Sequence, residues 1–160
     1  MSLAARRGLL AVLSEHGVRF VVIGGMAVIA HGHIRATKDV DIVFDTAEEN
    51  CSRFVGALKE LRAEVLASDT LPRAGEITAS WLGEGDQFVF ATEQGMLDAL
   101  ARTSVGGYDD LAPRAIETSM RDGSTFKGVS YDDLVRSKEA AGREQDMLDL
   151  KALREVRGEV

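Results

Sequence analysis

The spacing of apolar residues predicts that the first third of the chain alternates between helices and strands. A helical period covers residues 2–16, and the continuous apolar run at 20–23 is typical of a strand buried on both faces. A short helix over 26–30 and a second strand at 40–44 follow. This order predicts a mixed α/β domain.

A capping signal precedes the third predicted helix. Thr46 is followed three residues later by Glu49, which is the spacing of a capping box. The apolar positions beyond it recur at helical spacing and predict a buried face. That face comprises Cys51, Phe54, Val55, Leu58 and Leu61.

The middle of the chain carries a weaker pattern. Prolines and glycines interrupt residues 66–86, where only a short helix around 74–81 is predicted. Strands are predicted at 87–92 and 96–100, joined by a turn at Gly95.

The last third predicts a hairpin and two helices. The hairpin lies within 115–130 and has Asp122-Gly123 as its turn. Ser130 caps a helix at 131–140, and a glycine separates this helix from the last one. The last helix is predicted to place three apolar residues on one face: Met147, Leu150 and Leu153.

Composition indicates one globular domain over residues 1–160. The chain is 45% hydrophobic and 28% charged, which excludes disorder. It has no apolar run of the roughly 18 residues that a membrane span needs, no signal-peptide pattern and one cysteine, so we expect a cytoplasmic protein. A net charge of -7 argues against binding nucleic acid through bulk positive charge.

Two aspartates on the second predicted strand are the first candidates for chemistry. Because side chains alternate along a strand, Asp39 and Asp41 point to one side, and Val40 and Ile42 point to the other. Burying two like charges is costly without a partner. A divalent cation removes that cost, and Mg²⁺ prefers oxygen ligands together with substrate phosphates.

A glycine pair precedes the aspartates. Gly24 and Gly25 follow the first strand and open a helix, where exposed N–H groups attract phosphate oxygens. A phosphate cradle near two carboxylates indicates nucleotide chemistry. Alternatively, the glycines form a simple turn and the aspartates lie at an exposed strand end.

These residues together resemble the nucleotidyltransferase superfamily typified by DNA polymerase β. Its signature is a hydrophobic residue, Gly-Gly or Gly-Ser, a gap, and then Asp-x-Asp between hydrophobic residues, which residues 23–42 match. The strings at 35–41 and 131–150 look like the small bacterial branch of minimal and toxin-like members. The resemblance implies a polymerase-β-like fold, a small mixed β-sheet with helices packed on it, closed by helices at about 131–157.

The resemblance also implies a reaction. A nucleoside monophosphate would move from a nucleoside triphosphate, such as ATP, to an acceptor hydroxyl with release of pyrophosphate. Two Mg²⁺ ions would be bound by Asp39, Asp41 and a third carboxylate on a neighbouring strand, with Mn²⁺ as an alternative ion. Asp98 is our choice for the third carboxylate, and Glu93 and Asp86 are the alternatives.

Several further residues are candidates for binding the triphosphate. By resemblance, Gly24 and Gly25 would bind the β- and γ-phosphates. Three basic residues would reach the phosphates or would instead be solvated surface charges: Arg35, Lys38 and Lys138.

The remaining cation and acid pair in this region favours a structural role. Arg143 and Asp146 are three residues apart on a helix, so an ion pair that holds the last helix is the better interpretation.

The acceptor stays open between an RNA end, a protein side chain and a small molecule. Its recognition would come from residues 66–86, from a second subunit in a homodimer, or from a partner protein. A different class of function is also open: an inactive or weakly active nucleotide-binding or partner-binding module, such as one component of a toxin–antitoxin pair. An intact carboxylate set favours the enzyme.

Overall fold

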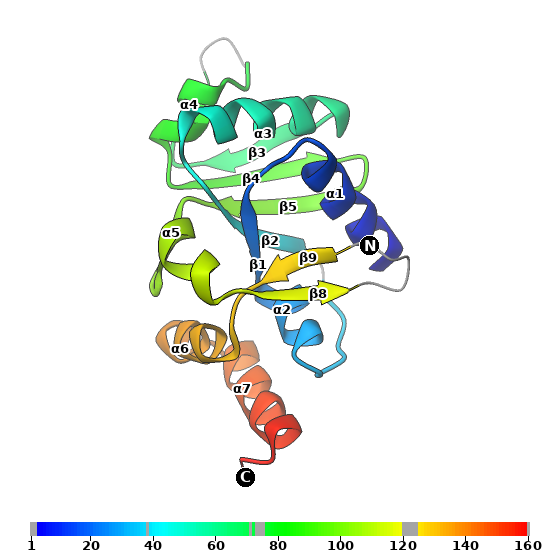
Figure 1. Cartoon of the computed structure of the whole chain (residues 1–160), viewed down its shortest axis with the longest axis vertical. Coiled ribbons are helices and arrows are strands. Elements are labelled where there is room, and N and C mark those ends of the chain that lie inside the picture. Colours follow the sequence, from blue (N-terminus) through cyan, green and yellow to red (C-terminus); the bar gives the residue numbers. More distant parts are fainter. Residues whose placement is uncertain (1–2, 38, 71, 73–75, 120–124, 160) are drawn as a thin grey trace.

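The structure, a computed structural model, describes residues 3–37, 39–70, 72, 76–119 and 125–159. Most strands join one mixed sheet of seven strands, and a two-stranded hairpin lies beside it (Figure 1). The strands are β1 (Phe20–Ile23), β2 (Asp39–Phe44), β3 (Glu64–Ser68), β4 (Gln87–Thr92), β5 (Gly95–Leu100), β6 (Arg102–Thr103), β7 (Gly106–Gly107), β8 (Ile116–Ser119) and β9 (Thr125–Gly128).

The sheet has the order β3-β4-β5-β2-β1-β9-β8. Strand β2 lies at its centre, antiparallel to β1 and parallel to β5. This mixed pairing confirms the predicted fold class. The helices are α1 (Leu3–Glu15), α2 (Gly24–Ala30), α3 (Glu48–Glu60), α4 (Ala79–Glu84), α5 (Tyr108–Leu111), α6 (Tyr131–Ala141) and α7 (Glu144–Arg157), and a 3-10 turn spans Ala112–Arg114.

Helices α1, α3 and α4 cover one face of the sheet, where the larger core lies. Strand alternation supplies its sheet side, because every second residue of β1, β2, β4 and β5 points into it. Its aromatic rings pack edge to face, for example Phe44 on Phe54 with centroids 5.2 Å apart. The buried sheet residues of this core are Phe20, Val22, Val40, Ile42, Phe44, Phe88, Phe90, Leu97, Ala99 and Phe126.

The opposite face is covered over a smaller area. A second core packs residues of α2, α5, α6 and α7 against β1 and the end of β2, through Val21 and Val43. On β2 and β5, the residues between those of the larger core point to this opposite face, and they include the candidate carboxylates. Figure 1 shows α6 and α7 side by side at the C-terminal end of the molecule.

The predicted capping box at Thr46 is wrong. Helix α3 begins after Ala47, and the structure gives it no side-chain cap. Asp45 accepts a hydrogen bond from the Ala47 N–H at 3.0 Å, and Glu49 pairs with Arg19 instead of folding back on the helix end.

The predicted helix at 74–81 is also displaced. Helix α4 occupies residues 79–84, and the Thr78 hydroxyl caps it by accepting from the Trp81 N–H. Residues 73–75 lie outside the described residues. Strand β3 was not predicted, because it is an edge strand with a bulge and an exposed Leu66.

The last two helices follow the prediction with one correction. Ser130 caps α6, and Gly142 ends it in a left-handed conformation at φ 59°. On α7, Leu150 and Leu153 are buried, but Met147 is 54% exposed. The predicted hairpin is β8–β9, and its turn at 120–124 lies outside the described residues.

A membrane span was not expected. None of the helices within the described ranges is long and apolar enough to cross a bilayer.

A buried amide ties the start of β1 to the end of β2. Asn50 on α3 accepts from the Arg19 N–H at 2.7 Å and donates to the carbonyls of Arg19 and Asp45. We expect Asn50→Ala to lower the free energy of unfolding by about 2–4 kcal/mol, because it leaves these buried groups unpaired. Urea denaturation measures this loss.

Glu49→Ala is the matched control on the same helix. Its carboxylate pairs with Arg19 at the surface, so its loss should cost less than about 0.5 kcal/mol. Equal effects of the two substitutions would contradict the role given to Asn50.

Candidate active site

The pairing of β2 with β5 brings three carboxylates together. Asp41 lies opposite Asp98 in the parallel register, and Asp39 is two residues before Asp41 on the same face. Neighbouring strands are about 4.8 Å apart, and paired residues project to the same side of a sheet. Because Val40 and Ile42 are buried in the larger core, the three carboxylates face the other way.

Gly24 allows the helix start to approach these carboxylates. Its φ of +66° is left-handed, and a Cβ at this position would collide with the Asp41 carboxylate. Ile23, the residue before it, pairs with Asp41 in the antiparallel ladder. The glycine therefore permits both the backbone conformation and the close packing of β1 against Asp39, Asp41 and Asp98, which we call the acidic row.

Burial and neighbouring carboxylates raise the pKa values of two of these groups, Asp41 and Asp98. Burial, followed by the hydrogen bond and negative charge of Asp98 and the charge of Asp39, raises the pKa of Asp41 to about 7, and Lys138 partly offsets this. Burial and the charge of Asp39 also raise the pKa of Asp98, against the lowering effect of its hydrogen bond to Asp41. Without a cation beside it, the Asp41 carboxyl is therefore partly protonated near neutral pH.

The acidic row forms the floor of a cleft of about 450 Å³. The α6–α7 hairpin forms the opposite wall, and the turn between β6 and β7 closes one side. This volume lies within the range of small-molecule sites. The lining residues are Ile23, Gly24, Asp39, Asp41, Gln87, Asp98, Leu100, Thr103, Ser104, Ser137, Lys138, Ala141, Arg143 and Asp146.

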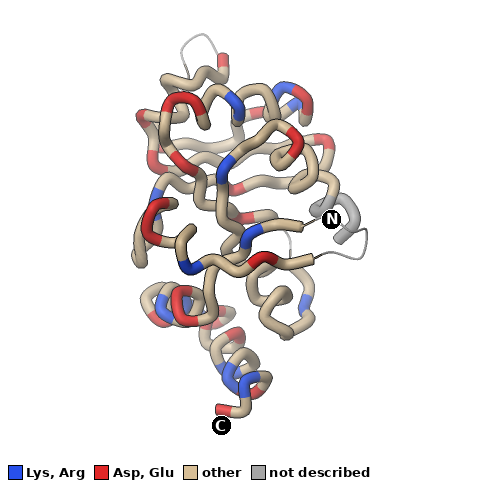
Figure 2. Tube along the Cα trace, in the orientation of Figure 1, with Lys and Arg blue, Asp and Glu red and all other residues tan. Residues whose placement is uncertain are grey.

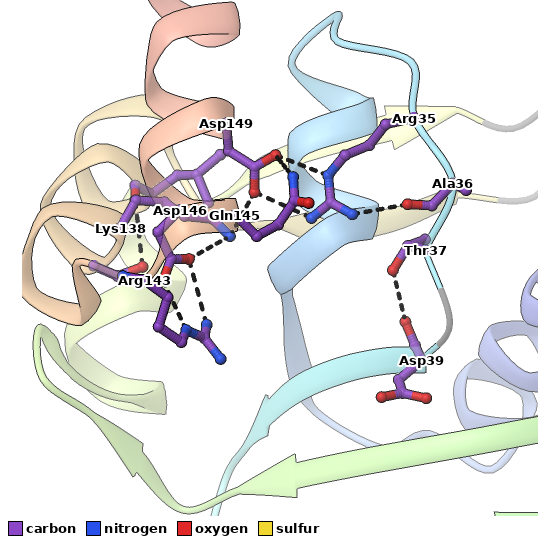
Figure 3. A network of polar contacts seen from close by, with 11 residues as sticks. Arg35, Ala36, Thr37, Asp39, Lys138, Arg143, Gln145, Asp146 and Asp149 are labelled. Atoms are coloured by element: carbon purple, nitrogen blue, oxygen red, sulfur yellow. Dashed lines mark hydrogen bonds and ion pairs between the residues drawn. The ribbon is translucent and has the colours of Figure 1, made fainter.

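The wall opposite the acidic row carries a buried ion network. The Lys138 side chain is 8% exposed, with Nζ 3.0 Å from Asp146 Oδ1 and 2.9 Å from Asp149 Oδ2. Arg143 bonds Asp146 through Nε at 2.7 Å (Figure 3). The predicted ion pair between Arg143 and Asp146 is thus confirmed.

The network extends to the segment that precedes β2. Arg35 donates from Nη2 to Asp149 Oδ2 at 3.1 Å, and Gln145 donates to Oδ1 of the same carboxylate (Figure 3). Burial opposes ionisation of Asp149, but the bonds from Lys138, Gln145 and Arg35 outweigh it and lower its pKa. Asp149 therefore stays ionised and joins α7 to α6 and to residues 31–37.

The structure places the predicted carboxylates as follows. Asp39, Asp41 and Asp98 line one cleft and come from two adjacent strands. The alternatives do not join them: Glu93 lies beside Arg62 at 3.6 Å, and Asp86 is exposed outside the cleft lining.

The predicted phosphate-binding residues divide into two groups. Gly24 and Lys138 line the cleft, whereas Gly25 packs against Thr37 and Arg35 points to Asp149, so neither belongs to the lining. Lys38 lies outside the described residues.

Sequence reasoning missed the buried acidic side of α7. Asp146 and Asp149 are buried and share a face with Leu150 and Leu153. The spacing of these four residues follows the helical period, so the stripe could have been read as one buried face. The two acids argued against a buried face, because carboxylates are seldom buried unless they are paired. The cations that pair with them come close only in the folded structure.

The acidic row suits a divalent cation that also binds water or phosphate oxygens. The donor set on the acidic row consists of carboxylate oxygens, which Mg²⁺ prefers, and their mutual repulsion is the unfavourable energy that a cation removes. In the described part of the chain, no group of three or more His, Cys, Asp or Glu side chains is arranged to hold a metal ion by itself. Water and phosphate oxygens would therefore complete the coordination, as is usual for Mg²⁺.

The fold agrees with the comparisons to known proteins. The family model described as nucleotidyltransferase of unknown function (DUF6036) matches residues 7–158, and the chain belongs to this family. Comparison with curated protein sequences gave no significant match.

Solved structures with the same fold include antibiotic-modifying enzymes. The lincosamide antibiotic adenylyltransferase LnuA, solved with lincomycin bound, is 17% identical, with 98% of each chain covered and a TM-score of 0.69. ANT(2'')-Ia in complex with adenylyl-2''-tobramycin is 14% identical, with 91% of this chain and 83% of that chain covered and a TM-score of 0.60. At these identities the likeness establishes the fold alone.

Gly24 is open to a direct test. We expect Gly24→Ala to lower the free energy of unfolding by at least about 2 kcal/mol, because alanine is strained at positive φ and its methyl group meets Asp41. Gly83→Ala on α4 is the control, since its Cβ would come no closer than 4.0 Å to other atoms and alanine favours a helix. An equal loss in both variants, measured in urea, would contradict this role.

Asp41 should destabilise the metal-free protein at neutral pH. Its folded-state pKa of about 7 exceeds the ordinary aspartate value of 3.8, so the folded state keeps a proton that the unfolded chain loses. The free energy of unfolding that this group contributes therefore falls as the pH rises from about 4 to about 7. We expect Asp41→Asn to raise Tm at pH 8 without metal by at least about 2–4 °C, which is about 1 kcal/mol.

The gain from Asp41→Asn should shrink as the pH approaches 4, because the wild-type carboxyl is then protonated in the folded state. Scanning calorimetry across this pH range, in a chelating buffer, measures both values. A Tm difference that does not change with pH would contradict the assignment of the raised pKa to Asp41.

Proposed function

We propose that the chain is a Mg²⁺-dependent nucleotidyltransferase that moves a nucleoside monophosphate from a nucleoside triphosphate to an acceptor hydroxyl and releases pyrophosphate. The observation that carries the proposal is the register of β2 and β5, which brings Asp41 and Asp98 together with Asp39 on one wall of the cleft. Cationic side chains occupy the opposite wall. Membership in a nucleotidyltransferase family supports it.

Asp39, Asp41 and Asp98 would hold the metal ions. Bound there, divalent cations supply charge stabilisation to the attacking and leaving oxygens of an in-line displacement. The protein's own contribution is positional, because Asp39 and Asp41 are fixed by the central strand and Asp98 by its parallel neighbour.

Asp98 is the group we assign to proton removal from the acceptor. It lies on β5, between β2 and β4, on the side of the acidic row that faces Val89 rather than Gly24. The acceptor would therefore enter beside Gln87 and the turn at Thr103 and Ser104, while the triphosphate lies towards Gly24 and the α6–α7 wall. A positioned base contributes about 10²- to 10⁴-fold to such a reaction.

A small molecule is the acceptor that we propose. Two structural relatives support the class, because their descriptions name adenylyl transfer to a lincosamide and an adenylylated tobramycin. ATP is accordingly the first donor to test.

The test uses ATP labelled on the α-phosphorus, Mg²⁺, and a panel of hydroxylated small molecules, with RNA and protein as the other acceptors. We expect label on one small-molecule hydroxyl and stoichiometric pyrophosphate. Asp98→Asn should lower kcat by at least about 100-fold, through loss of the base. Asp39→Asn and Asp41→Asn should abolish both transfer and the Mg²⁺ dependence of ATP binding.

Glu93→Gln is the matched control, because Glu93 is exposed beside Arg62 and does not line the cleft. It should retain wild-type kcat. Binding of MgATP without transfer to any acceptor would contradict the enzyme and support a nucleotide-binding module instead. Unchanged transfer by Asp39→Asn and Asp41→Asn would overturn the site assignment.

A further inference from the structure

Two cations line the cleft among the described residues, and they differ in how freely they can meet a ligand. Lys138 is 8% exposed and lies between Asp146 and Asp149. Arg143 is 76% exposed and stands at the beginning of α7, at the edge of the cleft. A ligand entering the cleft meets the arginine without any change in the buried network.

Among the residues that the structure describes, one carboxylate bonds the Arg143 side chain. Its Nε donates to Asp146 Oδ2 at 2.7 Å and its Nη2 to Oδ1 at 3.3 Å. Nη1 takes no part in these two bonds. Because the guanidinium is planar and carries five N–H donors, it can bind phosphate oxygens in a second direction or exchange one acid for another.

Asp146 would remain satisfied if the guanidinium moved. The Lys138 Nζ donates to Oδ1 at 3.0 Å, and the Arg143 backbone N–H donates to Oδ2 at 3.1 Å. Moving the Arg143 side chain therefore leaves no buried carboxylate without a cation. Moving Lys138 would remove a bond from two buried acids at once, leaving Asp146 with Arg143 and Asp149 with Arg35. This difference separates the two cations into a movable one and a fixed one.

We propose that Arg143 binds the triphosphate and that its guanidinium breaks its bonds to Asp146 when it does so. Lys138 stays in place and continues to neutralise Asp146 and Asp149. This inference rests on the proposed function and adds to it a residue that sequence reasoning assigned to structure alone. It also gives Lys138 a positioning role in place of direct phosphate contact. Arginine suits the task because its fork matches phosphate oxygens.

The decisive experiment compares Arg143→Ala with Arg154→Ala. Both arginines are exposed and bridge to an acid within the α6–α7 hairpin, since Arg154 pairs with Glu139 at 2.7 Å, but Arg154 does not line the cleft. Calorimetric titration with MgATP, inorganic tripolyphosphate and adenosine gives the affinities. Thermal denaturation gives the stability of each variant.

We expect Arg143→Ala to weaken binding of MgATP and tripolyphosphate on the order of 10- to 100-fold, the loss of a charge-assisted contact. Adenosine affinity and Tm should stay close to those of Arg154→Ala. Arg143→Lys should bind triphosphate with intermediate affinity, because it keeps the charge and loses the fork.

Wild-type affinity for triphosphate in Arg143→Ala, with transfer intact, would overturn the inference and leave the proposed function standing. An equal loss of adenosine affinity would also overturn it, because the substitution would then act through the structure. Failure of the wild type to bind any nucleoside triphosphate would overturn the proposed function and this inference together.

Discussion

The parallel pairing of β2 with β5 is the constraint on which the rest of the site depends. Strand register has a side-chain period of two, so a shift of one residue would bury Asp41 in the larger core and expose Ile42. The aromatic and aliphatic packing under Val40 and Ile42 makes that shift very costly. The hydrophobic core on one face therefore holds the carboxylates together on the other.

The cleft balances two opposed charge clusters. Its floor gathers acids that repel one another, and burial together with this repulsion raises the pKa of Asp41. Its far wall is the α6–α7 hairpin, along which basic and acidic residues are interspersed (Figure 2). In that wall Asp146 and Asp149 are buried, whereas Arg143 at the edge is exposed. The wall therefore presents positive charge to the cleft, and the buried acids hold the cations in place. A ligand that is itself anionic and brings cations with it suits both walls.

The sequence predicted the acidic floor well and the cationic wall poorly, for one physical reason. Asp39 and Asp41 belong to a strand whose alternation is local, and Asp98 stood out among apolar neighbours. The environment of Lys138 depends on two acids that come close only after α6 and α7 pack. Exposed Met147 shows the same limit, since its apolar character predicted burial on a face that the acids occupy.

The bond from Arg35 to Asp149 joins residues 114 positions apart in the chain. Closing so long a loop is entropically costly, so such a contact forms late relative to the local hairpins. During synthesis, the β2–β5 pairing can exist before α7 has emerged, with its carboxylates facing solvent. Residues 31–37 lack the contact between Arg35 and Asp149 until α7 docks. On this order of assembly, the cationic wall of the cleft is the last part of the site to form.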